Sequence, residues 1–411
     1  MVYVLNIDGQ PLMPTNRHGK VKYLLRQGKA KVVKRCPFTI KLLYETNNYT
    51  QDLILGVDTG SGTFATAVSR DNGDIVYLSE VILRNDITFK MTRRKEYRHN
   101  KRNRKTRYRK ARWLNRKNSK RKDRFSPTMV SKYHSHEKEI EYIKSILSIS
   151  KIVIEAGQFD THLMKNPSIK PWGYQKGPNY GFENTRAMIL NRDNYTCQYC
   201  KGKHKDGKLE VHHIVYRSNG GSNEESNLIT LCHTCHQDLH SGKINLKTSG
   251  KIKGTLKYAT QMNSIRVQLL KKYPEAIETF GYITKANRLA LDANKAHYYD
   301  ACVIATGGEP FKIKCDLIKK RCVADGDFRQ TRGIRSEQKL FTRKIMGFKK
   351  FDKVKYLGKE YFIKGRRSIG QAELMNIEGD RINFSFMPKG WKTPKMKNMI
   401  RLEARKSLII I

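Results

Sequence analysis

The sequence predicts an α/β protein built from several domains. Two apolar runs, residues 53–58 and 151–155, are interpreted as buried strands, and each ends in a carboxylate, Asp58 and Glu155. Helical patterns lie between and after these runs, and two Cys-x-x-Cys pairs indicate a separate metal-bound module. At 411 residues the chain is long enough for about two to four domains and for at least one buried core.

The charge balance is far too basic for an ordinary cytosolic enzyme. Lys and Arg number 82 against 37 Asp and Glu, a formal net charge of +45, and such a chain repels itself unless a polyanion neutralises it. Nucleic acid is the expected polyanion, with an anionic membrane surface second. No apolar run approaches the roughly 18 residues of a membrane span, and the first nine residues lack the basic start of a signal peptide. We therefore expect a cytoplasmic protein.

The first 50 residues predict a small basic α/β module. A strand is expected at Tyr3–Ile7, a helix at Val21–Gln27 that Gly28 ends, and a strand pair at Ala30–Val33 and Phe38–Tyr44. Composition alone leaves open that this module only caps the fold.

An antiparallel meander is expected next. Its strands are Leu53–Asp58, Phe64–Ser69 and Ile75–Leu83, and the turn between the last two is Asp71-Asn72-Gly73.

Residues 90–124 form the most basic segment, with 19 Lys or Arg among 35 residues. At spacings of three and four these cations form one stripe if the segment is helical. We expect this helix to lie against nucleic-acid phosphates, although a run of this kind can also be a solvated tail. The stripe consists of Arg94, Arg98, Lys101, Lys105, Arg109, Arg112 and Arg116.

The remainder of the chain alternates helical and strand patterns. A helix is expected at Glu137–Leu147 before the strand Lys151–Glu155, and a second helix over residues 286–306 places His297 and Asp300 one turn apart. The final segment predicts a small basic β-barrel. Its strands are Lys353–Leu357, Glu360–Lys364, Ala372–Ile377 and Arg381–Phe386.

Four cysteines predict a structural zinc site. Cys197 and Cys200 form one knuckle, Cys232 and Cys235 form the other, and 31 residues lie between them. Two such knuckles supply four thiolates at tetrahedral reach, the ligand set of a closed zinc site.

A histidine pattern lies within and after the knuckles. Residues 210–214 are a predicted strand that carries His212 and His213, Asn227 follows in a loop, and His236 and His240 share a helix face. By itself such a pattern can also be packing or further zinc ligation. In this order and frame it resembles the HNH (ββα-metal) nucleases.

The HNH resemblance implies a role for each residue. His213 is the general base and Asn227 fixes the loop that orients it. One divalent ion, usually Mg²⁺, is held by His212 and His236, with His240 as a possible third ligand.

Three carboxylates on separate elements suggest a second centre. Asp58, Glu155 and Asp300, with His297 one helical turn from the last, can converge on two Mg²⁺ ions. A single carboxylate at a strand end is more commonly a cap or turn residue. The motifs Gly56-Val57-Asp58, Ile152-Val153-Ile154-Glu155 and His297-Tyr298-Tyr299-Asp300 together resemble the RuvC branch of the RNase H-like fold.

A RuvC core interrupted by a basic helix and by an HNH module resembles the type II CRISPR effector nucleases. About 30 residues separate the basic segment from Glu155, which leaves no room for their large recognition lobe. Residues 9–14, with Pro11-Leu12-Met13-Pro14, resemble the PLMP motif of the IscB family of transposon-encoded, RNA-guided nucleases. Residues 158–177 and 347–368 resemble that family's connector and C-terminal domain. Thr59, where the family often has Pro, and Ala156-Gly157, where Val-Asn is usual, depart from it.

The IscB resemblance implies a domain plan. It comprises a PLMP domain at 1–50, RuvC segments at 51–89 and 125–180, a bridge helix at 90–124, an HNH domain at 181–243, a linker with the third RuvC segment at 244–335, and a target-motif domain at 336–411.

The same resemblance implies an RNA-guided double-strand DNA endonuclease. One protein would bind one guide (ω) RNA in a prokaryotic cytoplasm, HNH would cut the guide-paired strand and RuvC the displaced strand. The C-terminal domain, where Arg366 and Arg367 are candidate contacts, would recognise a short motif beside the target. The alternatives are a protein-only HNH/RuvC nuclease, of homing or junction-resolving type, and a guided DNA-binding protein with inactive sites.

Overall fold

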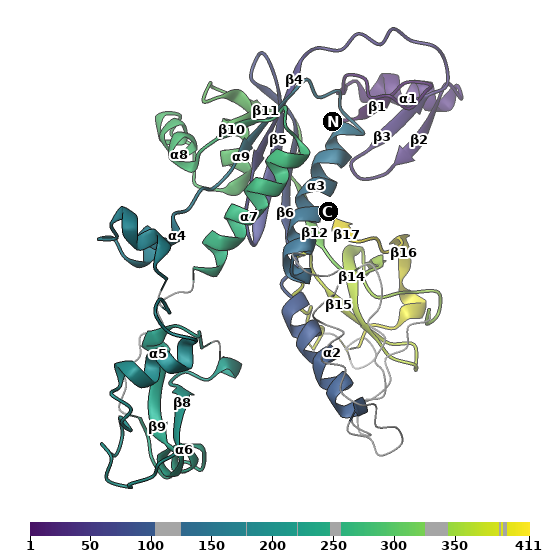
Figure 1. Ribbon diagram of the computed structural model, residues 1–411. Coiled ribbons are helices and arrows are strands. Elements are labelled where there is room, and N and C mark those ends of the chain that lie inside the picture. The colour runs from purple at the N-terminus through teal and green to yellow at the C-terminus, as the bar shows by residue number, and fades with distance from the viewer. Residues whose placement is uncertain are drawn as a thin grey trace. The chain divides into compact units, whose positions relative to one another are not determined.

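The computed structural model describes residues 1–102, 125–177, 179–219, 221–246, 256–324, 344–385, 388 and 393–411. The chain divides into two compact units, which confirms the predicted multidomain α/β class (Figure 1). The first unit comprises Met1–Gln158 and Gln261–Ile411, and the second comprises Phe159–Thr260. The second unit is therefore one continuous segment inserted into the first.

The N-terminal module is a three-stranded sheet with one helix. Strand β1 (Tyr3–Leu5) pairs in parallel with β3 (Thr39–Leu42), β2 (Ala30–Lys34) pairs antiparallel with β3, and α1 is His18–Arg26. This is the expected small α/β module, with its first strand two residues shorter than predicted. Its core consists of Val2, Val4, Val21, Ala30, Ile40 and Leu42.

The main sheet of the first unit begins with the predicted antiparallel meander. Strands β4 (Leu53–Asp58), β5 (Thr63–Arg70) and β6 (Asp74–Ile82) pair in sequence. Strand β7 (Lys151–Glu155) then pairs in parallel with β4, and β10 (Ile277–Thr279) pairs in parallel with β7.

Further strands extend the other edge of this sheet. Strand β12 (Ile318–Cys322) pairs in parallel with β6, and β17 (Leu408–Ile410) pairs antiparallel with β12. The short β11 (Lys312–Ile313) also pairs with β6. The full order is β10-β7-β4-β5-β6-β12-β17.

Helices cover both faces of the main sheet (Figure 1). Helices α3 (Pro127–Lys144) and α7 (Lys257–Lys272) bury apolar side chains against Leu53, Leu55 and Val57 of β4. Helix α9 (His297–Thr306) packs on the opposite face, beside α8 (Gly281–Ala290). Because strand side chains alternate between faces, Asp58 points toward α9.

Gly56 allows α9 to lie unusually close to β4. A Cβ atom at this position would lie 2.4 Å from Ala305 N and 2.6 Å from Ala301 O. Any side chain at residue 56 would therefore push α9 away from the strand that carries Asp58.

A buried ion pair links α3 to β12 inside the first unit. Lys320 Nζ lies 2.7 Å and 2.9 Å from the two carboxylate oxygens of Glu139 and donates to Tyr77 Oη at 2.6 Å. Both charged side chains are at most 1% exposed. Charges so deeply buried are tolerated because each neutralises the other and is hydrogen-bonded.

Two predicted helices differ from the observed ones. The helix expected at Glu137 begins ten residues earlier, because Ser126 accepts a hydrogen bond from Met129 N and Pro127 occupies the first turn. The single helix expected over residues 286–306 is two helices, α8 and α9. Helix α8 ends at Ala290, and Asp292 adopts a left-handed conformation (φ 49°) that no helix continues through.

The C-terminal segment forms a four-stranded sheet among its described residues, where the sequence predicted a barrel. Strands β13 (Lys353–Tyr356), β14 (Lys359–Arg366), β15 (Ala372–Met375) and β16 (Ile400–Glu403) lie in the order β15-β14-β13-β16. The strand predicted at Arg381–Phe386 is wrong over its described residues 381–385: Arg381 makes a single bridge to Met375, and residues 382–384 have no regular structure.

The predicted bridge helix is described only at its start. Helix α2 covers Ile87–Arg102, and residues 103–124 lie outside the described residues.

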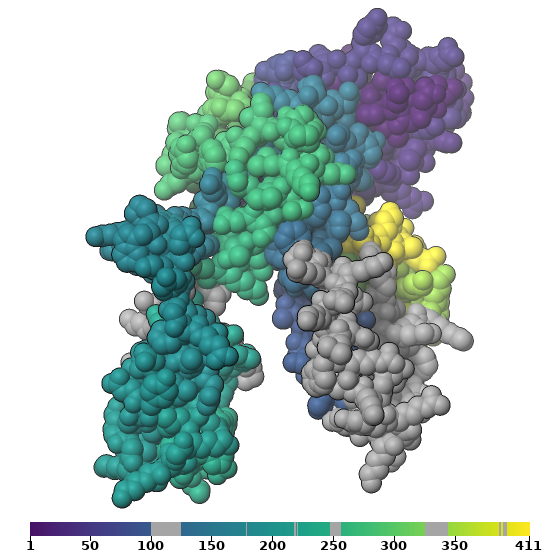
Figure 2. Space-filling view, viewed as in Figure 1, coloured from purple at the N-terminus to yellow at the C-terminus, as the bar shows by residue number. Residues whose placement is uncertain are grey.

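The second unit contains a hairpin followed by a helix. Strands β8 (Leu209–His213) and β9 (Leu228–Cys232) pair antiparallel, and α6 (His233–His240) follows directly. Its other helices are α4 (Thr161–Lys165) and α5 (Thr185–Arg192), with short 3₁₀ turns at Pro171–Gln175, Arg217–Asn219 and Glu225–Asn227. The residues of this unit form a packed body of their own (teal in Figure 2).

Within the described ranges, every helix is too short or too polar to cross a bilayer.

Candidate active sites and metal centres

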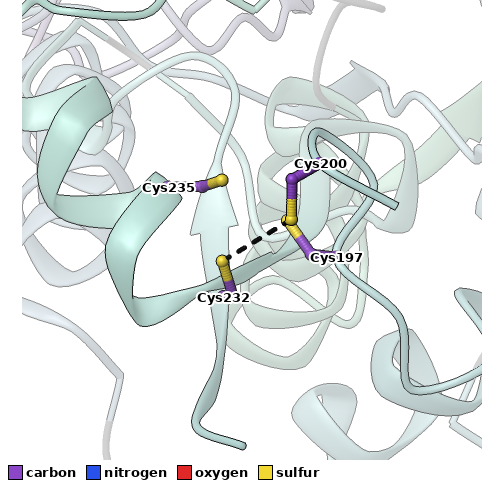
Figure 3. A group of neighbouring side chains, drawn as sticks. All are labelled: Cys197, Cys200, Cys232 and Cys235. Atoms are coloured by element: carbon purple, nitrogen blue, oxygen red, sulfur yellow. Dashed lines mark hydrogen bonds between the residues drawn. The ribbon is translucent and has the colours of Figure 1, made fainter. Parts of the chain in front are cut away.

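The four predicted zinc ligands meet in the second unit. Cys197 and Cys200 lie in the loop after α5, Cys232 ends β9, and Cys235 lies in the first turn of α6 (Figure 3). All four are buried, their Sγ atoms lie within 4.8 Å of one another, and the Cys200 and Cys232 sulfurs are 3.8 Å apart. A tetrahedron of Zn–S bonds places sulfurs about 3.8 Å apart, so these residues fit structural zinc.

Three histidines form a second cluster in the same unit. His212 lies on β8, and His236 and His240 lie one turn apart on α6. The ring of His212 is centred 5.0 Å from that of His236 and 5.1 Å from that of His240, and one nitrogen from each ring lies within 4.8 Å of the others. The hairpin and the helix that follows it therefore bring three imidazoles to one point.

Two imidazoles of this cluster, those of His212 and His236, have lowered pKa values that favour the neutral form. Burial, reinforced by the neighbouring His236 and His240, lowers the pKa of His212 to about 4, and burial also lowers the pKa of His236. Neutral imidazole is the form that binds a metal ion.

Glu210 orients one of these rings and was missed by the sequence analysis. Its Oε2 lies 2.7 Å from His236 Nδ1, and its Oε1 accepts from His233 Nδ1 at 3.0 Å. A carboxylate on Nδ1 directs the opposite ring nitrogen toward the cluster. The available signal was strand alternation, because Glu210 and His212 are two residues apart on β8 and share a face.

His213 lies outside the three-histidine cluster. Its Nε2 is 2.9 Å from Asn223 Oδ1 and 3.2 Å from Arg217 Nε, and Arg217 also donates to Asn223 Oδ1 at 2.8 Å. Neither Asn223 nor Arg217 was predicted as a site residue. Adjacent positions on a strand point to opposite sides, which separates the environment of His213 from that of His212.

Asn227 fixes the loop that follows His213. Its Nδ2 donates to Val215 O at 3.1 Å and to Ser222 O at 2.8 Å, and its Oδ1 accepts from Val215 N at 2.8 Å. Gly221 completes the loop, since a Cβ there would lie 1.8 Å from Val215 O. These three hydrogen bonds tie Asn227 to the loop between His213 and β9.

The carboxylate centre lies in the first unit at the carboxyl ends of two parallel strands. Asp58 of β4 and Glu155 of β7 are register partners, so they share the face that α9 covers. His297 Nδ1 lies 2.7 Å from Asp58 Oδ2, and Arg288 Nε lies 2.9 Å from Asp300 Oδ1 as an ion pair.

The electrostatics of this centre favour a bound cation. Burial raises the pKa of Asp58 and Asp300, and raises that of Glu155 to about 7, while the bond to Asp58 raises the pKa of His297. Glu155 Oε2 is buried and accepts no hydrogen bond from any residue that the structure describes, whereas Asp300 Oδ1 faces Arg288 as an ion pair. An unsatisfied carboxylate oxygen in a buried acidic site fits a hard cation such as Mg²⁺.

The three carboxylates are nevertheless spread more widely than the histidines. In the described part of the chain, ligand atoms within 4.8 Å of one another occur in the cysteine and histidine clusters but not in Asp58, Glu155 and Asp300. Like charges repel, and Asp58 and Asp300 instead pair with His297 and Arg288.

Residues around Asp58 hold this centre in shape and were also missed. Thr59 Oγ1 donates to Glu155 O at 2.6 Å, which ties the ends of β4 and β7 together. Lys132 of α3 donates to Ser61 O and Gln261, and the buried His136 accepts from Gly60 N at 3.4 Å.

Glu80 is a further carboxylate on the same face. The register runs from Asp58 to Ala65 on β5 and from Ala65 to Glu80 on β6. Glu80 therefore belongs to the same cross-strand row, two strands from Asp58.

The predicted nucleic-acid contacts are only partly described. Arg94 and Arg98 are exposed on α2. Arg366 donates to Phe348 O at 2.9 Å, and the exposed Arg367 lies 3.7 Å from Glu373. The side chain of Lys101 and all of Lys105, Arg109, Arg112 and Arg116 lie outside the described residues.

Comparison with protein families finds two matches along the chain. Residues 2–177 match the RRXRR protein family, and residues 197–242 match the HNH endonuclease family. The second match spans both zinc knuckles, the histidine cluster and Asn227, so the chain contains an HNH endonuclease domain.

Two curated proteins are similar to part of this chain. The "Anaredoxin" of a Nostoc species is 32% identical over 72 residues, which cover 18% of this chain and 91% of that protein. The "Type IV methyl-directed restriction enzyme EcoKMcrA" of Escherichia coli is 38% identical over 65 residues, which cover 14% of this chain and 23% of the enzyme. The chain therefore combines an N-terminal RRXRR segment with a following HNH endonuclease domain, an architecture shared by a family of nucleases.

Proposed function

Because this chain belongs to the IscB family of nucleases, we propose that it is an RNA-guided endonuclease that cuts both strands of DNA. The observation that carries the proposal is the presence of two separate candidate hydrolytic centres, one of histidines and one of carboxylates, in a chain of net charge +45.

The carboxylate centre supports a RuvC-type nuclease core. The order β6-β5-β4-β7-β10, a three-stranded antiparallel meander extended by two parallel strands, is consistent with an RNase H-like fold. Asp58, Glu155 and Asp300 would hold two Mg²⁺ ions, which when bound activate water and stabilise the leaving oxygen. His297 is fixed through Nδ1 by Asp58, so its other nitrogen is the one that can move a proton.

The histidine centre supports the HNH reaction. His213 would take a proton from the attacking water, with Asn223 and Arg217 against its Nε2 to set the ring's orientation. His212, His236 and His240 would hold one divalent ion, and Asn227 keeps the loop after His213 in place. The four cysteines would hold structural zinc that keeps β9 and α6 together.

The guide RNA is proposed from charge and from family membership. Arg94 and Arg98 present cations on α2, and they belong to the densest run of Lys and Arg in the sequence, residues 90–124. A single RNA bound per protein would neutralise much of this charge and would supply sequence specificity through base pairing. We place the complex in a prokaryotic cytoplasm, with the C-terminal domain reading a short motif beside the target.

The identity of the bound RNA tests the proposal directly. The chain would be expressed with its native flanking DNA, purified at high salt, and its RNA sequenced. We expect one discrete RNA with a fixed structured part and a variable end. Heterogeneous RNA, or none, would refute guidance and favour a protein-only nuclease, the function that the similarity to a restriction enzyme supports.

Strand-specific cleavage tests the division of labour. His213→Ala should leave a nickase that cuts only the displaced strand, and Asp58→Ala one that cuts only the guide-paired strand. The matched controls are His162→Ala, an exposed histidine of the second unit, and Asp52→Ala, an exposed carboxylate before β4. Linearised plasmid from either single-site variant would contradict the assignment.

A further inference from the structure

We propose that the histidine cluster selects an imidazole-preferring transition metal ion, of the class of Ni²⁺, Zn²⁺ and Fe²⁺, in place of Mg²⁺. The inference rests on the proposed nuclease function and deepens it: the two centres of this chain require different metal ions.

The cluster offers nitrogen ligands only. His212, His236 and His240 contribute one nitrogen each within 4.8 Å of one another, and the group includes no carboxylate. His212 is only 5% exposed, and β8 and α6 fix the three rings from two elements of regular structure. The ligand set is therefore preformed.

The carboxylate that contacts the cluster, Glu210, is already paired. Glu210 has one oxygen 2.7 Å from His236 Nδ1, and its other oxygen accepts from His233 and pairs with Lys208 at 3.3 Å. Glu210 therefore acts through His236 as a positioning residue, and the cluster lacks the oxygen ligands that Mg²⁺ would need.

Three imidazoles are a poor fit for Mg²⁺ and a good fit for a transition metal. Mg²⁺ requires near-octahedral oxygen ligands and gives up water reluctantly, whereas imidazole suits zinc, nickel, copper and iron. Three protein ligands with a remaining open position is the arrangement of a catalytic metal site. His240 is exposed and His236 half-buried, so the open position faces solvent, unlike the buried cysteine cluster.

The carboxylate centre has the opposite chemistry. Asp58, Glu155 and Asp300 supply oxygen ligands, and the buried Oε2 of Glu155 has no hydrogen bond from the described residues. Mg²⁺ would thus serve the first unit, and the transition metal would serve the second.

Nickel content tests the inference without any cleavage assay. The full chain, with its copurified RNA and its native zinc, would be dialysed against micromolar Ni²⁺ in millimolar Mg²⁺. Nickel and zinc per chain would then be measured by mass spectrometry. We expect nickel and zinc together to number about one ion more per chain in wild type than in the double variant His212→Ala, His236→Ala.

Two controls keep this measurement decisive. His162→Ala should match wild type, and one zinc ion retained per chain in the double variant shows that the cysteine cluster is still folded. If the double variant loses its zinc, Glu210→Gln replaces it, and its nickel affinity should fall about 10- to 100-fold. An equal sum of nickel and zinc in wild type and the cluster variant, or an unchanged affinity in Glu210→Gln, would overturn the inference.

Strand-specific cleavage is a second test of the metal preference. With Mg²⁺ alone the guided complex should cut only the displaced strand, and Ni²⁺ should restore cutting of the guide-paired strand. Equal cutting of the guide-paired strand with and without Ni²⁺ would also overturn the inference. Absence of a discrete guide RNA would instead refute the proposed function, and the nickel count would still decide the metal.

Discussion

Replacing Gly56 by alanine should displace helix α9 from β4 and thereby slow the cleavage proposed for the carboxylate centre. The new Cβ would lie 2.4 Å from Ala305 N, about 1 Å short of the 3.4 Å at which ordinary contact begins. The obstructing atoms are backbone, so α9 must move outward by about that distance, and it carries His297 and Asp300 with it. A misplacement of about 1 Å at a reacting centre can lower the rate about 100-fold.

The assay is cleavage of each strand of a labelled target by the guided complex. Gly56→Ala should cut the displaced strand about 100-fold more slowly and the guide-paired strand at the wild-type rate, because the histidine centre belongs to the other unit. Overpacking should also lower the free energy of unfolding by about 1–3 kcal/mol. Gly19→Ala, in α1 with open space around its Cβ position, is the matched control. Wild-type cutting of the displaced strand by Gly56→Ala would refute the proposed coupling between helix packing and the carboxylate centre.

Three other perturbations have defined outcomes. Burial raises the pKa of Glu155 from 4.5 to about 7, so its contribution to stability is complete below pH 4.5 and is lost as the pH rises through 7. The melting temperature of the metal-free protein should therefore fall between about pH 5 and 8. In Glu155→Gln the melting temperature should fall less steeply over the same range. Lys320→Met leaves the buried Glu139 carboxylate without its ion-pair partner and should lower the free energy of unfolding, measured by urea denaturation, by about 3–5 kcal/mol. The double variant Lys320→Met, Glu139→Leu should lose much less. Equal losses in the two variants would contradict the pairing. Asn227→Asp removes the two hydrogen bonds that the side chain donates, which contribute about 2 kcal/mol to stability. The variant should lower the melting temperature of the second unit and slow cutting of the guide-paired strand. Wild-type values of both would rule out the role of Asn227 in the loop.

The positions of Asp58 and Glu155 were predictable from sequence, but their exact pairing was not. An apolar run that ends in a carboxylate indicates where a strand stops. The register that sets Asp58 opposite Glu155 depends on hydrogen bonds between segments almost 100 residues apart, which no local pattern encodes.

The histidine cluster was more predictable than the residues that support it. His236 and His240 share a helix face through their spacing alone. Glu210 and Arg288 act through contacts formed only in the folded chain, with His236 and with Asp300. A charged residue on a strand or helix has no sequence signature that separates such a role from a solvated position.

The helix predicted over residues 286–306 shows the limit of periodicity. Apolar spacing continues across the boundary between α8 and α9, while the break depends on the backbone of Asp292. The break places His297 and Asp300 in the first turn of a new helix that packs directly on β4.

The insertion of one unit into the other imposes an order on biosynthesis. All residues of the histidine and cysteine clusters lie between positions 197 and 240, whereas the carboxylate centre needs Asp300 from beyond the insertion. During translation from the N-terminus, the second unit can therefore fold on the ribosome while β4 and β7 still lack α9. A nascent chain arrested shortly after the inserted segment would carry a complete metal-binding module and an unfinished acidic site.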